Sequence, residues 1–125
     1  MHHSDVEKKI MRGSRAALEK KALDLVVFDL REISDVADYF LICHGMSDKQ
    51  VRAIADAIEN ALREVGVRMD HKEGYQEATW ILLDYGDMVI HVFTEEKRQY
   101  YDLERLWGDA PRIDVSSLIT SPADE

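Results

Sequence analysis

The sequence offers one cysteine beside a histidine, the pairing that a thiol nucleophile and its base require. Cys43 and His44 are adjacent, and neighbouring residues of a strand point to opposite faces of its sheet. A nucleophile and its base must lie within hydrogen-bond distance of each other, so this pair is not expected to be catalytic. As the single cysteine, Cys43 forms no disulfide within the chain, and we predict that it lies in the core.

Carboxylates are the next candidates, because two-metal chemistry needs several of them on one face of a strand. Asp84 and Asp87 are three residues apart and flank a turn, and the apolar run 88–93 contains no carboxylate. His44, His71 and His91 lie on separate segments without the short spacing typical of metal ligands. We therefore predict no catalytic residue, no metal site and no cofactor.

The loop Gly45 to Ser47 precedes an apolar-periodic segment. Free backbone N–H groups at the start of a helix can bind an anion, although an ordinary capped helix is the simpler interpretation. A nucleotide-binding or nucleotidyltransferase enzyme that uses this loop is therefore kept as the alternative function.

Aromatic and charged residues gather on the segments 80–84 and 88–93 and on the turn between them. Strand alternation places Trp80 and Asp84 on one face, where Trp80 could equally fill the core or join an interface. Tyr85 lies at the turn and favours an interface, because exposed aromatics beside charge are typical of binding surfaces. His91 is expected to be buried or half-buried and hydrogen-bonded to a neighbour.

The charge of the chain is unevenly distributed. Of its 125 residues, 16 are Lys or Arg and 25 are Asp or Glu, for a net charge of −9. Residues 1–24 hold six basic and four acidic side chains (+2), which leaves 10 basic and 21 acidic (−11) for residues 25–125. An acidic body repels phosphate, so we expect no direct sequence-specific contact with nucleic acid, and contact with a basic protein instead.

The length fits one domain. The apolar runs are far shorter than the roughly 20 residues of a membrane-spanning helix, and the N-terminus lacks the apolar core of a secretory signal. We therefore expect a cytoplasmic protein that makes no membrane contact.

The hydrophobic pattern predicts an α/β domain with a mixed sheet of about five strands and packed helices. Ser14 is the expected N-cap of the first helix, and Thr94 that of the last. Ser47 and Gly66 flank the segment with the clearest helical period. Helices are expected at 14–23, 48–65 and 94–107, an antiparallel strand pair at 25–30 and 39–43, a weak strand at 67–71, and a hairpin at 80–84 and 88–93.

Four segments, 37–47, 50–55, 80–93 and 101–109, closely resemble the ribosomal silencing factor (Iojap-like) family. His44 departs from the family pattern, in which many members carry a small hydroxyl residue there. The resemblance covers about residues 14–109, which we expect to form the family's domain. We expect a flexible arm at 1–13 and a mobile tail at 110–125.

The resemblance implies a nucleotidyltransferase-like fold that serves as a noncatalytic adaptor. Members of the family bind the large ribosomal subunit on the protein numbered fourteenth, block joining of the small subunit, and lower translation when nutrients are scarce. Matching positions suggest a partner-binding surface made of Trp80, Asp84, Tyr85, Asp87 and His91. We also expect the free protein to be a homodimer, because exposed Trp80 and Tyr85 would leave an apolar patch.

Overall fold

The computed structural model describes residues 2–35 and 37–115, with side chains from residue 6 onward. The helices are α1 (His2–Glu19), α2 (Asp48–Glu64), α3 (Glu95–Tyr101) and α4 (Leu103–Leu106). The strands are β1 (Leu23–Asp29), β2 (Tyr39–Gly45), β3 (His71–Glu73), β4 (Trp80–Asp84), β5 (Met88–Thr94) and β6 (Arg112–Ile113).

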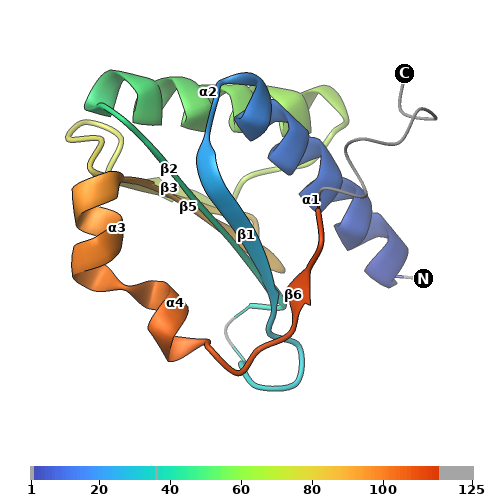
Figure 1. Cartoon of the computed structure of the whole chain (residues 1–125). Coiled ribbons are helices and arrows are strands. Elements are labelled where there is room, and N and C mark those ends of the chain that lie inside the picture. Colours follow the sequence, from blue (N-terminus) through green and yellow to red (C-terminus); the bar gives the residue numbers. More distant parts are fainter. Residues whose placement is uncertain (1, 36, 116–125) are drawn as a thin grey trace.

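The strands form one mixed sheet in the order β3-β4-β5-β2-β1-β6. β2 and β5 are parallel, whereas β1/β2, β1/β6, β3/β4 and β4/β5 are antiparallel. α1 and α2 cover one face of the sheet, and α3 and α4 lie on the other (Figure 1). The mixed α/β fold, the β1/β2 pairing and the β4/β5 hairpin are confirmed, with six strands in place of about five.

The centre of the sheet is formed by its most apolar strands, β2 and β5. Every residue of β2 except the half-buried Phe40 is buried, and so is every residue of β5 except Thr94. Cys43 is fully buried, as expected, and burial raises the pKa of its thiol to about 12. Within the described residues no helix is both long and apolar enough to cross a membrane.

Helix α2 follows its predicted pattern closely. Its apolar stripe is buried against the sheet, and the Ser47 side chain accepts a hydrogen bond from the backbone N–H of Gln50 at 3.1 Å. Gly66 follows the helix with a φ of +80°, a conformation that glycine adopts without steric cost. Both ends of the helix are therefore set by local sequence.

Helix α1 is longer than predicted. It begins at His2 instead of residue 14, because Val6 and Ile10 extend its apolar face and are buried in the core. The expectation of a flexible arm over 1–13 is therefore wrong for the described residues of that segment. Ser14 is a buried residue inside the helix and not its N-cap.

The C-terminal third also differs from expectation. The helix predicted at 94–107 has Thr94 as its N-cap but is interrupted at Asp102, whose φ is +49°. After α4 the chain returns to the sheet as β6, and Ala110 and Val115 are buried. The prediction of a mobile tail is therefore wrong for residues 110–115, which belong to the folded domain. Residues 116–125 lie outside the described residues.

The weak strand predicted at 67–71 is found later in the chain. β3 occupies His71–Glu73 at the edge of the sheet, and its three residues are exposed. The apolar residues Val67 and Met69 instead pack, half-buried, against the main core cluster. Their apolar character therefore reflects packing in the segment after α2 and not a strand.

Candidate partner-binding surface

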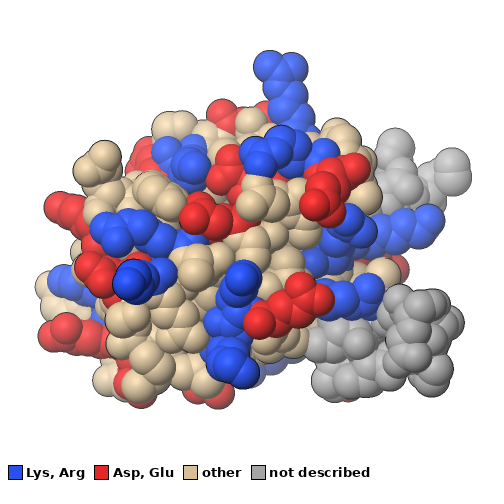
Figure 2. All heavy atoms as spheres, turned by 90° about the horizontal axis from the view of Figure 1, so that it is seen from above, with Lys and Arg blue, Asp and Glu red and all other residues tan. Residues whose placement is uncertain are grey.

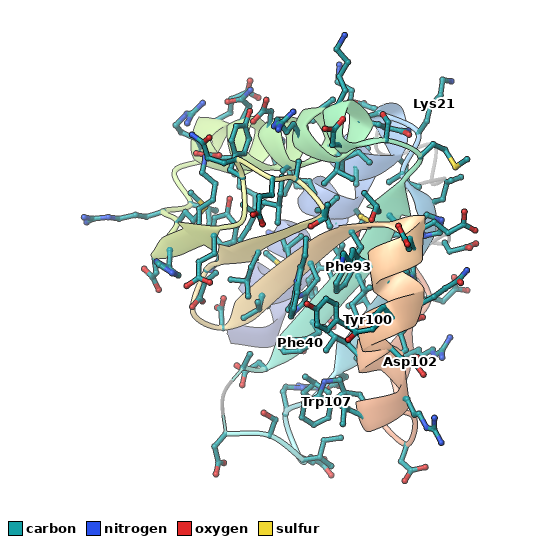
Figure 3. All side chains as sticks on the ribbon, turned by 90° about the vertical axis from the view of Figure 1, so that its left-hand side faces the viewer. Lys21, Phe40, Phe93, Tyr100, Asp102 and Trp107 are labelled. Carbon is teal, nitrogen blue, oxygen red and sulfur yellow. The ribbon has the colours of Figure 1, made fainter. Side chains whose placement is uncertain are left out.

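The sheet face opposite α1 and α2 carries a cluster of rings. We call this the aromatic face and define it by six residues: Phe40, Trp80, His91, Phe93, Tyr101 and Trp107. They come from β2, β4, β5 and the α3–α4 region, and Figure 3 shows Phe40, Phe93 and Trp107 beside these two short helices. This face thus unites residues far apart in the sequence.

Trp80 lies half-buried in the aromatic face. Its ring centroid is 5.0 Å from that of Phe93 and 4.6 Å from that of Tyr101. Ile81 and Leu83 point to the other face and are fully buried, which confirms the predicted alternation of β4. Trp80 therefore packs against neighbouring rings while part of its side chain stays accessible.

His91 is buried beside Trp80 on the neighbouring strand, and a hydrogen bond joins the two side chains. The indole N–H of Trp80 donates to Nδ1 of His91 at 3.1 Å, which confirms the expected hydrogen-bonded imidazole. Because indole nitrogen only donates, Nδ1 is the acceptor and the neutral ring carries its proton on Nε2. Burial lowers the pKa of His91 to about 4, so the ring is neutral near pH 7. Nε2 is buried without a partner in the described structure.

Asp84 and Asp87 shape the hairpin turn. The Asp84 carboxylate accepts a hydrogen bond from the backbone N–H of Gly86 at 2.8 Å. The Asp87 carboxylate forms an ion pair with Lys9 of α1, with an Nζ–Oδ2 distance of 3.3 Å. Both carboxylates are half-buried, so they combine a structural role with partial exposure at this edge.

Tyr85 is not exposed at the turn, contrary to the prediction. It is 7% exposed, and its hydroxyl has no hydrogen-bond partner in the described structure. The alternation that puts Trp80 on the aromatic face continues to Tyr85 and sends it to the α2 side. The structure therefore brings Trp80 and His91 together and separates Tyr85 from them. The alternation along β4, extended by one residue, would have predicted that Tyr85 lies on the face opposite Trp80.

Sequence reasoning missed three exposed apolar side chains on α3 and α4. Tyr100 is 75% exposed, Leu106 71% and Tyr101 45%. A continuous helix would have placed Tyr100 and Leu103 on one buried stripe. The helix is instead interrupted at Asp102, and α3 packs through the buried Arg98 and through Tyr101, which contacts Trp80, so Tyr100 lies off the packed side.

The opposite side of the molecule is charged. Viewed over α1 and α2, Lys and Arg side chains alternate with Asp and Glu over much of the surface (Figure 2). On the side of the aromatic face, Tyr100, Tyr101 and Leu106 are exposed.

The loop at 45–47 was the candidate anion site. Gln50 fills it: its side-chain oxygen accepts from the backbone N–H of Met46 at 2.7 Å, and its own backbone N–H donates to Ser47. Next to the loop, His44 is buried and its Nδ1 accepts from Arg98 at 2.9 Å. Burial, together with the charge of Arg98, lowers the pKa of His44. Across residues 2–35 and 37–115, no three His, Cys, Asp or Glu side chains cluster as metal ligands would.

Comparison with known proteins identifies the family. The family model described as "Ribosomal silencing factor during starvation" matches residues 3–125. The chain is 51% identical over 110 residues to the ribosomal silencing factor of Bacillus subtilis, which covers 87% of this chain and 93% of the relative.

Solved structures agree. A crystal structure from Chromobacterium violaceum matches with a TM-score of 0.80 and 31% identity, over 82% of this chain and 85% of that one. Another, from Bacillus halodurans, matches with a TM-score of 0.77 and 41% identity, over 86% of this chain and 98% of that one. The sequence motifs, the matched length and the shared fold lead to one conclusion: the chain belongs to the ribosomal silencing factor family.

Proposed function

We propose that this protein binds the large ribosomal subunit through the ribosomal protein numbered fourteenth and blocks the small subunit from joining. This lowers translation when nutrients are scarce. The proposal is supported by the family match and by relatives that are named ribosomal silencing factors. Steric blockade requires occupancy and bulk and no catalytic residue, so the protein acts as a noncatalytic adaptor in the cytoplasm.

The observation that carries the proposal is the partial exposure of the aromatic face. Trp80 is half-buried, and it lies against Tyr101, which is 45% exposed. Tyr100 and Leu106 extend this apolar surface on α3 and α4. Aromatic side chains at the centre of an interface commonly supply most of its binding energy.

The negative charge of the protein favours binding to a basic partner. Residues 25–125 carry a net charge of −11, and Asp84 and Asp87 lie half-buried at the hairpin end of β4 and β5. Complementary charge speeds association with a basic protein while disfavouring indiscriminate contact with RNA phosphate.

The proposed contact surface differs in part from the sequence-based one. It retains Trp80, Asp84 and Asp87 and adds Tyr100, Tyr101 and Leu106. His91 serves it by positioning the Trp80 ring. The Tyr85 side chain lies on the other face of β4, so it is excluded from direct contact.

Co-sedimentation with separated ribosomal subunits tests the proposal. We expect the protein to pellet with large subunits and not with small ones, and its prior addition should reduce formation of joined ribosomes. Equal pelleting with both subunits, or undiminished joining, would remove the silencing role.

A matched pair of variants tests the surface. Trp80→Leu keeps an apolar side chain but removes the ring, and it should weaken large-subunit binding by about 2 kcal/mol, or roughly thirtyfold. The control is Val65→Ala, at a residue that is 53% exposed just after α2, and it should bind like the wild type. If Trp80→Leu binds normally while its melting temperature shows that it is folded, the aromatic face is not the contact surface.

A further inference from the structure

A cavity of about 390 Å³ lies on the side of the sheet away from the aromatic face. The end of α2, the segment 66–69 and Tyr85 line it. Its volume falls within the range of small-molecule sites, which are about 300–1,000 Å³. Val67, Met69 and the Tyr85 ring form an apolar wall, and charged groups lie at the rim.

Tyr85, one of the lining residues, carries a buried hydroxyl. The residue is 7% exposed, and the oxygen is buried without a hydrogen-bond partner in the described structure. Burial raises the pKa of Tyr85 to about 12, so near pH 7 the hydroxyl is neutral and can both donate and accept. A buried hydroxyl without a partner is unfavourable, and a ligand group that supplied one would be favoured.

Some of the charged groups at the rim are already paired within the chain, and one is not. Glu59 is held by Lys72, with an Nζ–Oε1 distance of 3.0 Å, and by Arg63 at 3.7 Å. Arg63 also donates to Asn60. Arg68 is exposed, and no hydrogen bond or ion pair engages it within the described part of the chain. The available charge at this rim is therefore the Arg68 guanidinium.

We propose that this cavity binds a small amphipathic carboxylate that carries a hydroxyl at its far end. The carboxylate pairs with Arg68, the lining cation that no other described residue engages. The apolar body packs on Val67 and Met69, and the hydroxyl reaches the Tyr85 hydroxyl. Because the Tyr85 hydroxyl is buried in the free protein, the ligand must displace the lining side chain that covers it. This site is independent of ribosome binding, because it uses the opposite face of the sheet.

Three probes dissect the site: 4-hydroxyphenylacetate, phenylacetate without the hydroxyl, and tyramine without the carboxylate. Each is titrated into the full ¹⁵N-labelled chain while amide shifts are followed by NMR. We expect saturable shifts at residues 63–69 with 4-hydroxyphenylacetate. Binding should be about fivefold weaker for each of the other two probes, the effect of losing one polar contact.

Two variants assign the contacts. Tyr85→Phe should bring 4-hydroxyphenylacetate to the affinity of phenylacetate, and Arg68→Gln should weaken both carboxylates about equally. Arg105→Gln, at an exposed arginine of α4, is the control and should change neither affinity. The proposal is overturned if no probe gives saturable shifts at 63–69, or if Tyr85→Phe keeps the preference for the hydroxylated probe.

Discussion

At the scale of single residues, the Trp80–His91 hydrogen bond links a buried imidazole to the edge of the aromatic face. The bond exists only while Nδ1 of His91 is an acceptor, so protonation of the ring breaks it. Tyr85 presents the opposite case, a buried polar atom that lacks a partner within the described residues. For each residue we can therefore predict whether a defined change raises or lowers the free energy of unfolding.

Protonation of His91 should destabilise the protein in mild acid. Its pKa falls from 6.5 when unfolded to about 4 when folded, so the unfolded state binds the proton more readily between these values. Its contribution to stability is complete above pH 6.5 and should fall by about 2 to 3 kcal/mol as the pH drops to 4. Urea denaturation at a series of pH values measures this loss.

The control for this pH dependence is His91→Gln, which keeps a side-chain acceptor for Trp80 and does not titrate. All other titratable groups are the same in the two proteins, so the difference between the two curves isolates His91. Identical slopes for the two proteins between pH 6.5 and 4 would contradict the assignment.

Removing the Tyr85 hydroxyl should stabilise the free protein. Tyr85→Phe eliminates a buried polar atom without a partner and keeps the ring, so we expect a gain of about 1 kcal/mol in the free energy of unfolding. Tyr85→Ala should instead lose about 3 to 5 kcal/mol, because it leaves a cavity in the core. Urea denaturation measures both, and a loss of stability in Tyr85→Phe would show that the hydroxyl is satisfied in solution.

At the scale of elements, two glycines in the left-handed conformation let the chain turn after α2 and after β3. Gly66 and Gly74 have nearly the same φ, +80° and +81°, but their surroundings differ. A Cβ at Gly66 would meet nothing within 4 Å, whereas one at Gly74 would lie 2.0 Å from the carbonyl oxygen of Trp80. The chain can therefore pass this close to the Trp80 backbone only because residue 74 has no side chain.

These two glycines form a matched pair for mutation. Gly66→Ala should cost about 1 to 2 kcal/mol, the penalty of a left-handed conformation alone. Gly74→Ala should cost clearly more, because the Trp80 backbone must also move. Thermal and urea denaturation compare the two variants, and equal losses would mean that the turn at 74–79 adjusts freely.

At the scale of the whole molecule, three exposed apolar side chains lie together on α3 and α4. The face over α1 and α2 mixes both signs of charge (Figure 2), while Tyr100, Tyr101 and Leu106 are exposed beside the aromatic face. Apolar patches of this kind mark association sites. The homodimer that we propose for the free protein therefore uses α3 and α4 and not Tyr85.

Self-association should depend on these exposed side chains. Light scattering should give a dimer mass for the wild-type protein, and the double variant Tyr100→Ser, Leu106→Ser should give a monomer mass. Both residues are more than 70% exposed, so the fold should change by less than about 0.5 kcal/mol per site. A monomer mass for the wild type at high concentration would refute the dimer.

The sequence by itself determined the elements with strong local patterns. The stripe of α2, its Ser47 cap and Gly66 lie within one stretch of chain, and so do the hairpin of β4 and β5 and the buried run around Cys43. Periodicity and caps are local properties, so they can be read without knowing the neighbours. The family motifs were equally visible.

Tertiary structure decided where side chains of ambiguous character lie. Val6 and Ile10 extend α1 to His2 because the core accepts them, and β6 forms because the chain returns beside β1. Trp80 meets His91 and Tyr101 only after β4, β5 and α3 pack together. Burial and pairing depend on contacts between distant segments, which local propensity does not encode.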